Sequence, residues 1–410
     1  MKLQCDIQLP ASKSESNRAL MIAAYGGFVP DFQNLSDSLD TLVLAEAIRR
    51  AQRGDTTIDI AGCGTAARFM TTFLACLEGE WRLTGTERMK QRPIKPLVEA
   101  LEKLGADIQY AEKQGFLPLQ IHGKPILGGK VAVDMSRSSQ FASSLLLAAP
   151  MFSQGLELEL LENLSSLPYL EMTLSMMRHF EAEAKRQGKT VFVKSKSYQL
   201  KAFEVSADWS AASYWYEMAA LSEDCEIRLQ SLRPIEGSKS CLNIQGDAII
   251  ADWMKPFGVV TIVEEGCIVL KNKPIERQVF TFDFTNNPDL FPSMAATCAG
   301  LQVKSRFLGV ANLGIKESDR IESMKTELAK IGTGLEQVSE DELVLKPSVC
   351  LPVFEPSAPL HFNAHDDHRI VMALAPLSIK LGSLSFDHPE VVAKSYPRYW
   401  QDVSFLSVCR

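Results

Sequence analysis

The sequence predicts an α/β protein with internal symmetry, built from six related strand–helix units. Six segments begin with small polar residues and continue into an apolar helix pattern. A short strand-like run, a polar loop and, in most units, a second helix pattern follow each of them. Recurrence of one such unit along a chain is typical of a repeat architecture.

The first helix of each unit is apolar on nearly all sides, so we expect it to be buried. The pattern places the helix starts near residues 14, 64, 138, 210, 289 and 368. These starts form two groups of three. We therefore predict two domains, with the boundary near Ala202.

The second helix of each unit is amphipathic, as in Leu97, Leu101 and Leu104, so we expect it at the periphery. The pattern recurs over 94–105, 170–180 and 321–332 and in a helix beyond Gly246, and a loop over 389–397 follows the strand of the sixth unit. The first copy, over 39–50, is weaker.

Composition places limits on the class of protein. The chain has 410 residues, 46% of them hydrophobic, and a net charge of −7, which argues against a general nucleic-acid binder. Nine irregularly spaced cysteines, without a C-x-x-C pair, suggest neither a disulfide framework nor a zinc site. No signal peptide or membrane-spanning run is visible, so we expect a cytoplasmic protein.

The helix starts carry positive charge, which a helix N-terminus disfavours. Polar residues there have an ordinary explanation as caps, and for a single serine capping remains the alternative. Free N–H groups and the helix dipole also favour a bound anion, and cations beside them would strengthen such a site. We therefore predict phosphate or carboxylate binding. The cations concerned are Lys13, Arg18, Arg68, Arg137 and Arg369.

Further cations lie in the loops before the second helices. Arg88 with Arg92, and Lys316 with Arg320, form one cluster in each half of the chain. Arginine suits bidentate contacts to oxyanions. These clusters predict two half-sites that face one cleft. For Lys90 and Arg398 in the same loops, simple solvation is the favoured interpretation.

Seven motifs resemble those of 5-enolpyruvylshikimate-3-phosphate synthases, in order and in approximate spacing. They span the chain from about Leu9 to Tyr399. They are L-P-A-S-K-S-E-S-N-R-A-L at 9–20, G-T-A-A-R-F at 64–69, R-M-K-Q-R-P-I at 88–94, S-S-Q-F at 138–141, N-L-G-I-K-E-S-D-R at 312–320, D-H-R at 367–369 and K-S-Y-P at 394–397.

The resemblance implies a two-domain, inside-out α/β barrel with three repeats per domain. The N-terminal strand joins the second domain, giving residues 11–202 and residues 1–10 plus 203–410. It also implies transfer of the enolpyruvyl group of phosphoenolpyruvate to the 5-hydroxyl of shikimate 3-phosphate in a cleft between the domains. Phosphate is released without a metal, a cofactor or a covalent enzyme intermediate. We expect a monomer with these two small-molecule substrates and no nucleic-acid or membrane partner.

Roles transfer from the family by position. Lys13 is expected between the two substrates as a catalytic residue, and Gly64 should let backbone approach a ligand closely. The positions matching the shikimate 3-phosphate site are Lys13, Ser14, Arg18, Ser138, Ser139, Gln140, Ser166, Asp289, Asn312 and Lys316. Those matching the phosphoenolpyruvate site are Lys13, Gly64, Arg88, Gln140, Arg320, Arg369 and Lys394.

Two carboxylates match the family's proton-transfer groups. The reaction is an addition followed by an elimination, so protons move at a hydroxyl and at a methylene carbon. Asp289 is the expected base for the 5-hydroxyl, and Glu317 the expected acid and base at the methylene carbon. The alternatives are a helix cap for Asp289 and a surface ion pair with Arg320 for Glu317.

Some positions depart from the family pattern or allow another interpretation. Gly62 and Cys63 stand where Asn and a small residue are common, Phe69 where proline is frequent, and Asp366 where Asn is common. Cys63 is either a reactive thiol at a helix start or a small residue that fits. Three histidines are of a residue type that binds metal ions, but their spacing argues against a metal site. They are His361, His365 and His368.

Two rival functions remain. One is a related enolpyruvyl transferase acting on a UDP-sugar, which lacks the S-K-S-x-S-N-R opening. The other is a non-catalytic phospholigand-binding homologue, which would have lost Asp289, Glu317 or Lys394.

Overall fold

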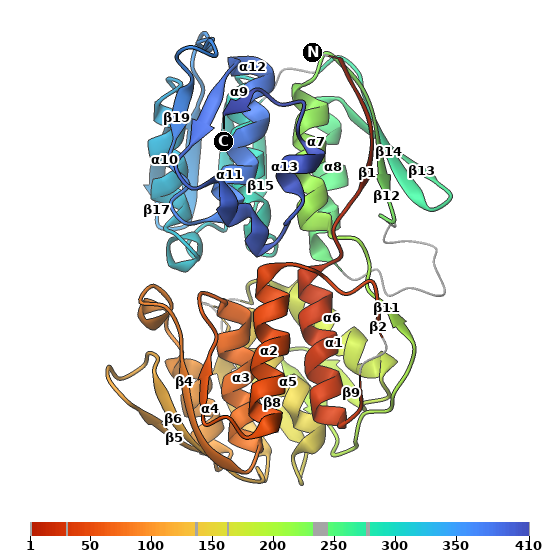
Figure 1. Ribbon diagram of the computed structural model, residues 1–410, viewed down its shortest axis with the longest axis vertical. Helices are drawn as coiled ribbons and strands as arrows, with labels where there is room; N and C mark the ends of the chain where they lie inside the picture. Colours follow the sequence, from red (N-terminus) through yellow and green to blue (C-terminus); the bar gives the residue numbers. More distant parts are fainter. Residues whose placement is uncertain are drawn as a thin grey trace. The chain divides into compact units, whose positions relative to one another are not determined.

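The chain folds as alternating helices and strands in two units. The computed structural model describes residues 2–29, 32–135, 138–161, 164–232, 245–275 and 279–409. One unit comprises Met1–Ala11 with Ser206–Arg410, and the other Ser12–Val205. Strand β1 (Lys2–Gln8) therefore belongs with the second half of the chain, where it pairs in parallel with β12 (Asp224–Gln230). Figure 1 shows β1 running beside β12 and β14.

Four sheets share one topology. In each, two parallel strands come first, and an antiparallel hairpin is added to the second of them. The strand orders are β3-β4-β6-β5 and β7-β8-β10-β9 in the unit of residues 12–205, and β1-β12-β14-β13 and β15-β16-β18-β17 in the other. Their remaining strands are β3 (Thr57–Asp59), β4 (Gly79–Thr84), β5 (Asp107–Tyr110), β6 (Leu119–Gly123), β7 (Gly129–Asp134), β8 (Leu156–Leu161), β9 (Ala184–Gln187), β10 (Thr190–Val193), β13 (Val259–Glu264), β14 (Cys267–Asn272), β15 (Phe280–Asp283), β16 (Ser305–Leu308), β17 (Gly334–Ser339) and β18 (Glu342–Lys346).

The third sheet of each unit is smaller and parallel throughout. Strands β2 (Phe32–Gln33) and β11 (Phe203–Glu204) form a pair in the unit of residues 12–205. In the other unit, β19 (Leu360–Phe362), β20 (Leu384–Phe386) and β21 (Val408–Cys409) form a three-stranded sheet. Each unit therefore has three sheets, in agreement with three repeats.

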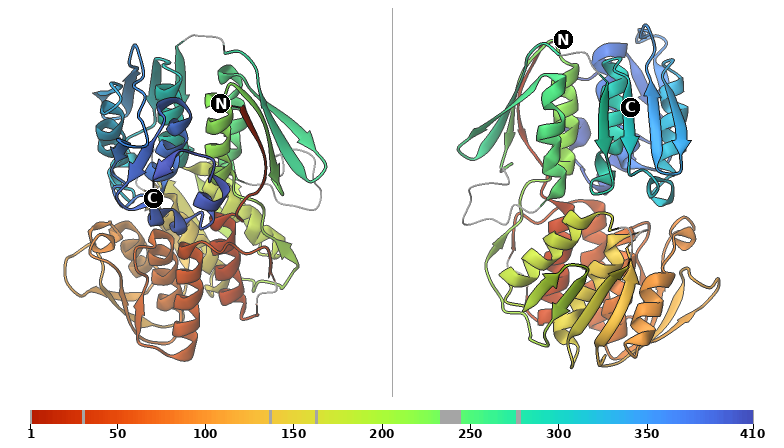
Figure 2. Two further views of the ribbon diagram at one scale, coloured as in Figure 1. Left: turned by 45° about the horizontal axis from the view of Figure 1, so that its top comes forward. Right: turned by 180° about the vertical axis from the view of Figure 1, so that it is seen from behind.

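Three helices pack against one another at the centre of each unit. They are α1 (Lys13–Gly26), α3 (Gly64–Cys76) and α5 (Ser139–Ala148) in one unit, and α7 (Trp209–Leu221), α9 (Phe291–Gly300) and α11 (His368–Leu374) in the other. All residues of α9 and α11 are buried. The predicted buried helices and their starts are thus confirmed, although a 3₁₀ turn over Pro288–Leu290 precedes α9. The right-hand view of Figure 2 shows sheet β7-β8-β10-β9 in front of its helices.

The second helices flank these central helices. They are α2 (Leu39–Arg53), α4 (Lys95–Lys103), α6 (Leu167–His179), the short α8 (Ile250–Trp253) and α10 (Arg320–Ala329). The sixth unit has 3₁₀ turns over Pro389–Lys394, within the predicted loop over 389–397, and a one-turn helix, α13 (Tyr399–Asp402), follows that loop. Among the described residues, none of the helices combines the length and apolar character needed to cross a bilayer.

Candidate active site

A cluster of charged side chains is centred on Arg320, the first residue of α10. Its guanidinium is only 1% exposed and contacts three carboxylates. Nη1 donates to Asp289 Oδ1 at 2.8 Å, Nη2 to Glu317 Oε2 at 2.9 Å and Nε to Asp367 Oδ2 at 2.9 Å. Three carboxylates from separate segments therefore meet around the side chain of Arg320.

Arg369 and Lys394 complete this cluster. Arg369 Nη2 donates to Asp289 Oδ2 at 2.7 Å, so Asp289 is held by two arginines. Lys394 Nζ lies 4.0 Å from Glu317 Oε1. Asp367 caps α11 by accepting from the Arg369 N–H at 3.0 Å. Four segments that are far apart in the sequence, around residues 289, 320, 369 and 394, thus bring their functional groups together within one unit.

The cations set the protonation state of Asp289. Burial alone would raise the pKa of this carboxyl, but Arg369, Arg320 and Lys316 outweigh burial and hold the pKa far below its usual range. For Arg320, burial opposes the charged form, but Asp367, Glu317 and Asp289 raise the pKa of the guanidinium above its ordinary value. Lys316, together with Asn312, flanks the 3₁₀ turn Leu313–Ile315 and is half-buried.

Asp247 is a member of this site that the sequence motifs missed. Its Oδ2 accepts from Ser210 Oγ at 2.5 Å, and its Oδ1 accepts from Asn287 Nδ2 at 3.1 Å. Burial and the nearby Asp289 carboxylate raise the pKa of Asp247 to about 6. It lies outside the seven motifs, and an isolated Asp after a glycine gives no signal of its own.

In the unit of residues 12–205, Lys13 pairs with a buried acid. Lys13 Nζ lies 3.0 Å from Asp40 Oδ2, near the start of α2. The sequence analysis did not identify Asp40 as a partner of Lys13. An Asp in the first turn of a helix is common, because it interacts favourably with the helix dipole.

Arg18 is fully surrounded by protein groups. Its guanidinium donates to Thr173 Oγ1 at 2.7 Å, Ser14 O at 2.9 Å, Tyr169 O at 3.2 Å and Ser143 Oγ at 3.4 Å. Burial lowers its pKa to about 10, despite opposing contributions from Tyr169 and Glu15. Arg18 therefore ties α1 to α5 and α6.

The serine and glutamine positions lie at the starts of central and flanking helices. Ser138 caps α5 by accepting from the Gln140 N–H, and Gln140 Nε2 donates to Thr65 Oγ1 at 3.0 Å. This contact places the start of α5 beside the start of α3. Ser139 is buried, and Ser166 precedes α6 in a left-handed conformation with φ of 58°.

Gly64 makes room for two arginines. A Cβ at this position would lie 2.7 Å from Arg92 Nη1 and 2.9 Å from Arg68 Nη1. Arg68 also donates to Gly64 O at 2.9 Å. Arg88 is exposed just before the 3₁₀ turn Met89–Gln91. The glycine thus admits the side chains of Arg92 and Arg68 to the helix start.

The cations at the helix starts have protein partners, which the sequence interpretation did not foresee. Arg18 and Arg68 each donate to the carbonyl four residues earlier. Lys13 and Arg369 pair with Asp40 and Asp289. Arg137 lies outside the described residues. Positive charge at these starts is therefore partly neutralised by the protein itself.

The remaining candidates have structural partners. His365 contacts Glu327 and His361 contacts Ser385, and the part of the chain that the structure describes contains no His, Cys, Asp or Glu group able to hold a metal. Cys63 is buried and caps α3, accepting from the Ala66 N–H at 3.3 Å. This favours the interpretation of Cys63 as a small residue that fits.

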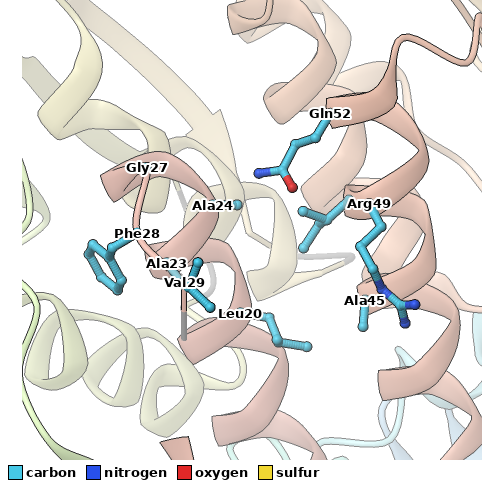
Figure 3. Close-up of a pocket in the computed structure, with 10 residues that line it drawn as sticks. Leu20, Ala23, Ala24, Gly27, Phe28, Val29, Ala45, Arg49 and Gln52 are labelled. Atoms are coloured by element: carbon cyan, nitrogen blue, oxygen red, sulfur yellow. The ribbon is translucent and has the colours of Figure 1, made fainter. Parts of the chain in front are cut away.

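A pocket of about 390 Å³ lies between α1 and α2. Figure 3 shows Leu20, Val29 and Ala45 around it, with Arg49 and Gln52 as its longer polar side chains. A largely apolar lining does not suit two phosphorylated substrates, which need several cations or N–H donors. None of the predicted site residues lines this pocket.

Comparison with known proteins identifies the family. The family described as EPSP synthase (3-phosphoshikimate 1-carboxyvinyltransferase) matches residues 50–403. This chain belongs to the EPSP synthase family. The resemblance carried by the seven motifs is thereby confirmed.

Individual relatives agree with this assignment. Two proteins named 3-phosphoshikimate 1-carboxyvinyltransferase, from Bacteroides fragilis strains YCH46 and ATCC 25285, are each 40% identical to this enzyme, over 403 and 405 residues, and cover 98% of it and 95% of themselves. An enzyme of the same name from Syntrophobacter fumaroxidans is 32% identical over 422 residues, with 97% and 96% coverage. The solved EPSP synthase of Acinetobacter baumannii has a TM-score of 0.73 at 20% identity, covering 99% of this chain and 96% of its own, which supports the fold.

Proposed function

We propose that Asp289 and Glu317 perform the proton transfers of the family's reaction, while Arg320, Arg369 and Lys394 bind phosphoenolpyruvate. The enzyme transfers the enolpyruvyl group of phosphoenolpyruvate to the 5-hydroxyl of shikimate 3-phosphate and releases phosphate. The observation that carries the proposal is the contact set of Arg320. One buried guanidinium holds both candidate carboxylates, while a second arginine and a lysine contact the same two acids.

The charge balance of this cluster gives Asp289 its role. With its pKa held low by Arg369, Arg320 and Lys316, the carboxylate of Asp289 is a weak base. The carboxylate and phosphate of phosphoenolpyruvate would share these cations and weaken their hold on Asp289. The pKa of Asp289 would then rise toward its ordinary range, where it accepts the 5-hydroxyl proton more readily. Substrate binding thus activates the base.

Glu317 is suited to proton transfer at the methylene carbon of phosphoenolpyruvate. It contacts Arg320 on one oxygen and approaches Lys394 with the other, so it lies between two cations assigned to phosphoenolpyruvate. Its side chain is 16% exposed, whereas Arg320 is enclosed. In the addition step it would protonate the methylene carbon, and in the elimination step it would remove a proton from the resulting methyl group. The cations stabilise negative charge on the departing phosphate.

Residues of the other unit are proposed to bind shikimate 3-phosphate and the rest of phosphoenolpyruvate. Support comes from the contact of Gln140 with Thr65, which brings two helix starts together, and from the arginines beside Gly64. Helix starts supply N–H donors to phosphate oxygens. The proposed shikimate 3-phosphate contacts are Lys13, Ser14, Arg18, Ser138, Ser139, Gln140 and Ser166, with Asp289, Asn312 and Lys316; Lys13, Gly64, Arg88 and Gln140 join the phosphoenolpyruvate set.

We also infer the finer architecture and state of the enzyme. The two units with three sheets each support an inside-out α/β barrel of three repeats per domain, with domains over 11–202 and over 1–10 plus 203–410. We propose that it acts as a cytoplasmic monomer without nucleic-acid or membrane partners. The net charge of −7 supports the absence of a nucleic-acid partner, and light scattering coupled to gel filtration would test the monomer.

Phosphate release tests the proposed catalytic roles. We expect release from phosphoenolpyruvate to require added shikimate 3-phosphate. Asp289→Asn and Glu317→Gln should each lower kcat by about 100-fold or more, because each removes a proton-transfer group, while calorimetry shows shikimate 3-phosphate binding retained. Asp252→Asn is the matched control, since this carboxylate pairs with Lys255 on the surface. Near-normal kcat in either variant would contradict the assignment.

The same assay separates the rival functions. The names of the relatives favour shikimate 3-phosphate over a UDP-sugar as the acceptor. A UDP-sugar transferase would release phosphate with its own acceptor alone, and a non-catalytic homologue would release none with either.

A further inference from the structure

The segment Asn363–Asp367 leads from β19 into α11 and carries an unusual backbone. His365 and Asp366 both have positive φ, at 50° and 52°. Neither is glycine, and residues with a side chain adopt such conformations at a cost in free energy. A strained pair of this kind persists only where surrounding contacts hold it in place.

Glu327, near the end of α10, supplies those contacts. Its carboxylate is completely buried. Oε2 accepts from the Asn363 N–H at 3.0 Å, and Oε1 contacts His365 Nε2 at 2.9 Å. Lys330 Nζ also lies 2.6 Å from Oε2 and offsets the buried charge. From the other side, Asp387 Oδ1 accepts from the Ala364 N–H at 2.7 Å.

Helix α10 is therefore attached to this segment at two points. At its start, Arg320 donates to Asp367, and near its end, Glu327 holds Asn363 and His365. Seven residues separate the two points, which is about 10 Å along a helix axis. Two attachments fix both the distance and the rotation of the segment relative to α10, whereas one would leave it free to pivot.

The attachment determines how the two arginines meet at Asp289. Arg320 belongs to α10, and Arg369 lies just beyond the segment, where Asp367 caps its N–H. Both guanidinium groups contact the same carboxylate, at 2.8 and 2.7 Å. A shift of the segment would separate Arg369 and Asp367 from Arg320.

We propose that Glu327 is a positioning residue for phosphoenolpyruvate binding. By holding Asn363 and His365, it sets the spacing of Arg320 and Arg369 that the anion requires. The inference rests on the proposed function, which assigns these arginines to phosphoenolpyruvate. Glu327 itself does not touch the substrate and acts through the segment.

Glu327→Ala provides the main test. We expect KM for phosphoenolpyruvate to rise by about tenfold or more, a factor that corresponds to about 1.4 kcal/mol. KM for shikimate 3-phosphate should change less than about twofold, because binding of that substrate is assigned mostly to the other unit. Glu327→Gln should give a smaller rise, since its amide oxygen still accepts one of the two hydrogen bonds.

Two further variants control for folding. His365→Ala removes one contact from a partly exposed side chain and should raise KM for phosphoenolpyruvate in a folded protein, even where Glu327→Ala fails to fold. Lys325→Ala removes an exposed cation of the same helix that pairs with Glu322, leaves both contacts of Glu327 to the segment in place and should leave the ratio of the two KM values unchanged. A lower melting temperature in Glu327→Ala and His365→Ala, with both KM values unchanged or raised equally, would reduce Glu327 to a structural role.

Arg369→Ala distinguishes this inference from the proposed function. If Arg369→Ala leaves KM for phosphoenolpyruvate unchanged, the assignment of the arginines is wrong. If it raises that KM while the Glu327 and His365 variants do not, the site assignment stands and the positioning role of Glu327 is overturned.

Discussion

At the scale of single residues, the sequence identified the charged groups but not their partners. The motifs contain Arg320 and Glu317, the family resemblance points to Asp289, and periodicity places the arginine at a helix start. That one guanidinium would hold three carboxylates depends on contacts between segments far apart in the chain. A buried arginine requires such partners, because its desolvation is costly. Asp247 and Asp40 were missed for the same reason, since only tertiary packing gives them a role.

Arg88→Ala should weaken phosphoenolpyruvate binding without affecting the fold. Arg88 is exposed, so its removal should leave the melting temperature unchanged. Loss of one charge-assisted contact should raise KM for phosphoenolpyruvate by about 10- to 100-fold. Steady-state kinetics and calorimetry check this, with Lys90→Ala as the neighbouring control. Loss of shikimate 3-phosphate binding instead would show that the partition of the site is wrong.

Asp247→Asn should change how stability depends on pH. The pKa of Asp247 is raised in the folded state from 3.8 to about 6. Between these values the folded state binds more protons than the unfolded state, so this group lowers stability as pH rises from about 4 to about 6. The loss amounts to roughly 3 kcal/mol at most. Above about pH 6 this loss of stability is complete.

Denaturant unfolding of both proteins at pH 4 and pH 7 measures this effect. The stability difference between Asp247→Asn and the wild type should favour the variant more at pH 7 than at pH 4. Asp289 acts in the opposite direction, because its pKa is lowered, so the comparison between the two proteins reports Asp247 together with its interaction with Asp289. An equal difference at both pH values would contradict the raised pKa.

At the scale of elements, the central helices could be predicted and the hairpins could not. Helices such as α9 and α11 are apolar all round, which indicates burial without further information. The outer strand of each hairpin lies at a sheet edge, as β17 does with one buried residue in six. A strand of that kind has no clear alternation of polar and apolar residues. The recurring β-hairpin after the flanking helix therefore became visible only in the folded chain.

Gly64→Ala should separate function from stability at the start of α3. The added Cβ would meet the ends of Arg92 and Arg68 at 2.7 and 2.9 Å, and both side chains are flexible enough to move. Alanine also favours the helix, so stability should change by less than about 1 kcal/mol. The displaced guanidinium groups should raise KM for phosphoenolpyruvate several-fold.

Thermal melting and steady-state kinetics test this prediction together. Gly105→Ala is a control for glycine replacement. Because Gly105 has a positive φ, this change should lower stability and leave KM for phosphoenolpyruvate unchanged. A strongly destabilised Gly64→Ala with unaltered KM would show that the arginines cannot adjust.

At the scale of the whole molecule, the chain order conceals the unit boundaries. Residues 12–205 are inserted between β1 and the strand with which it pairs, β12. Sequence periodicity predicts the change between the third and fourth repeats near Ala202. The prediction that β1 joins the second half of the chain rested on the family resemblance alone. A seven-residue strand carries no local information about a partner more than two hundred residues away.

The inserted unit should fold independently. It leaves and rejoins the other unit at adjacent points, since Ala11 and Ala207 form a β-bridge and the Asp208 N–H donates to Pro10 O at 2.9 Å. Adjacent ends are typical of insertions that keep their own core. A fragment of residues 12–205 should therefore unfold cooperatively in thermal melts followed by circular dichroism, yet release no phosphate. A fragment of residues 12–155 lacks β8–β10 and should not fold. If residues 12–205 melt without a cooperative transition, the two units depend on each other for stability, and the insertion does not constitute a domain.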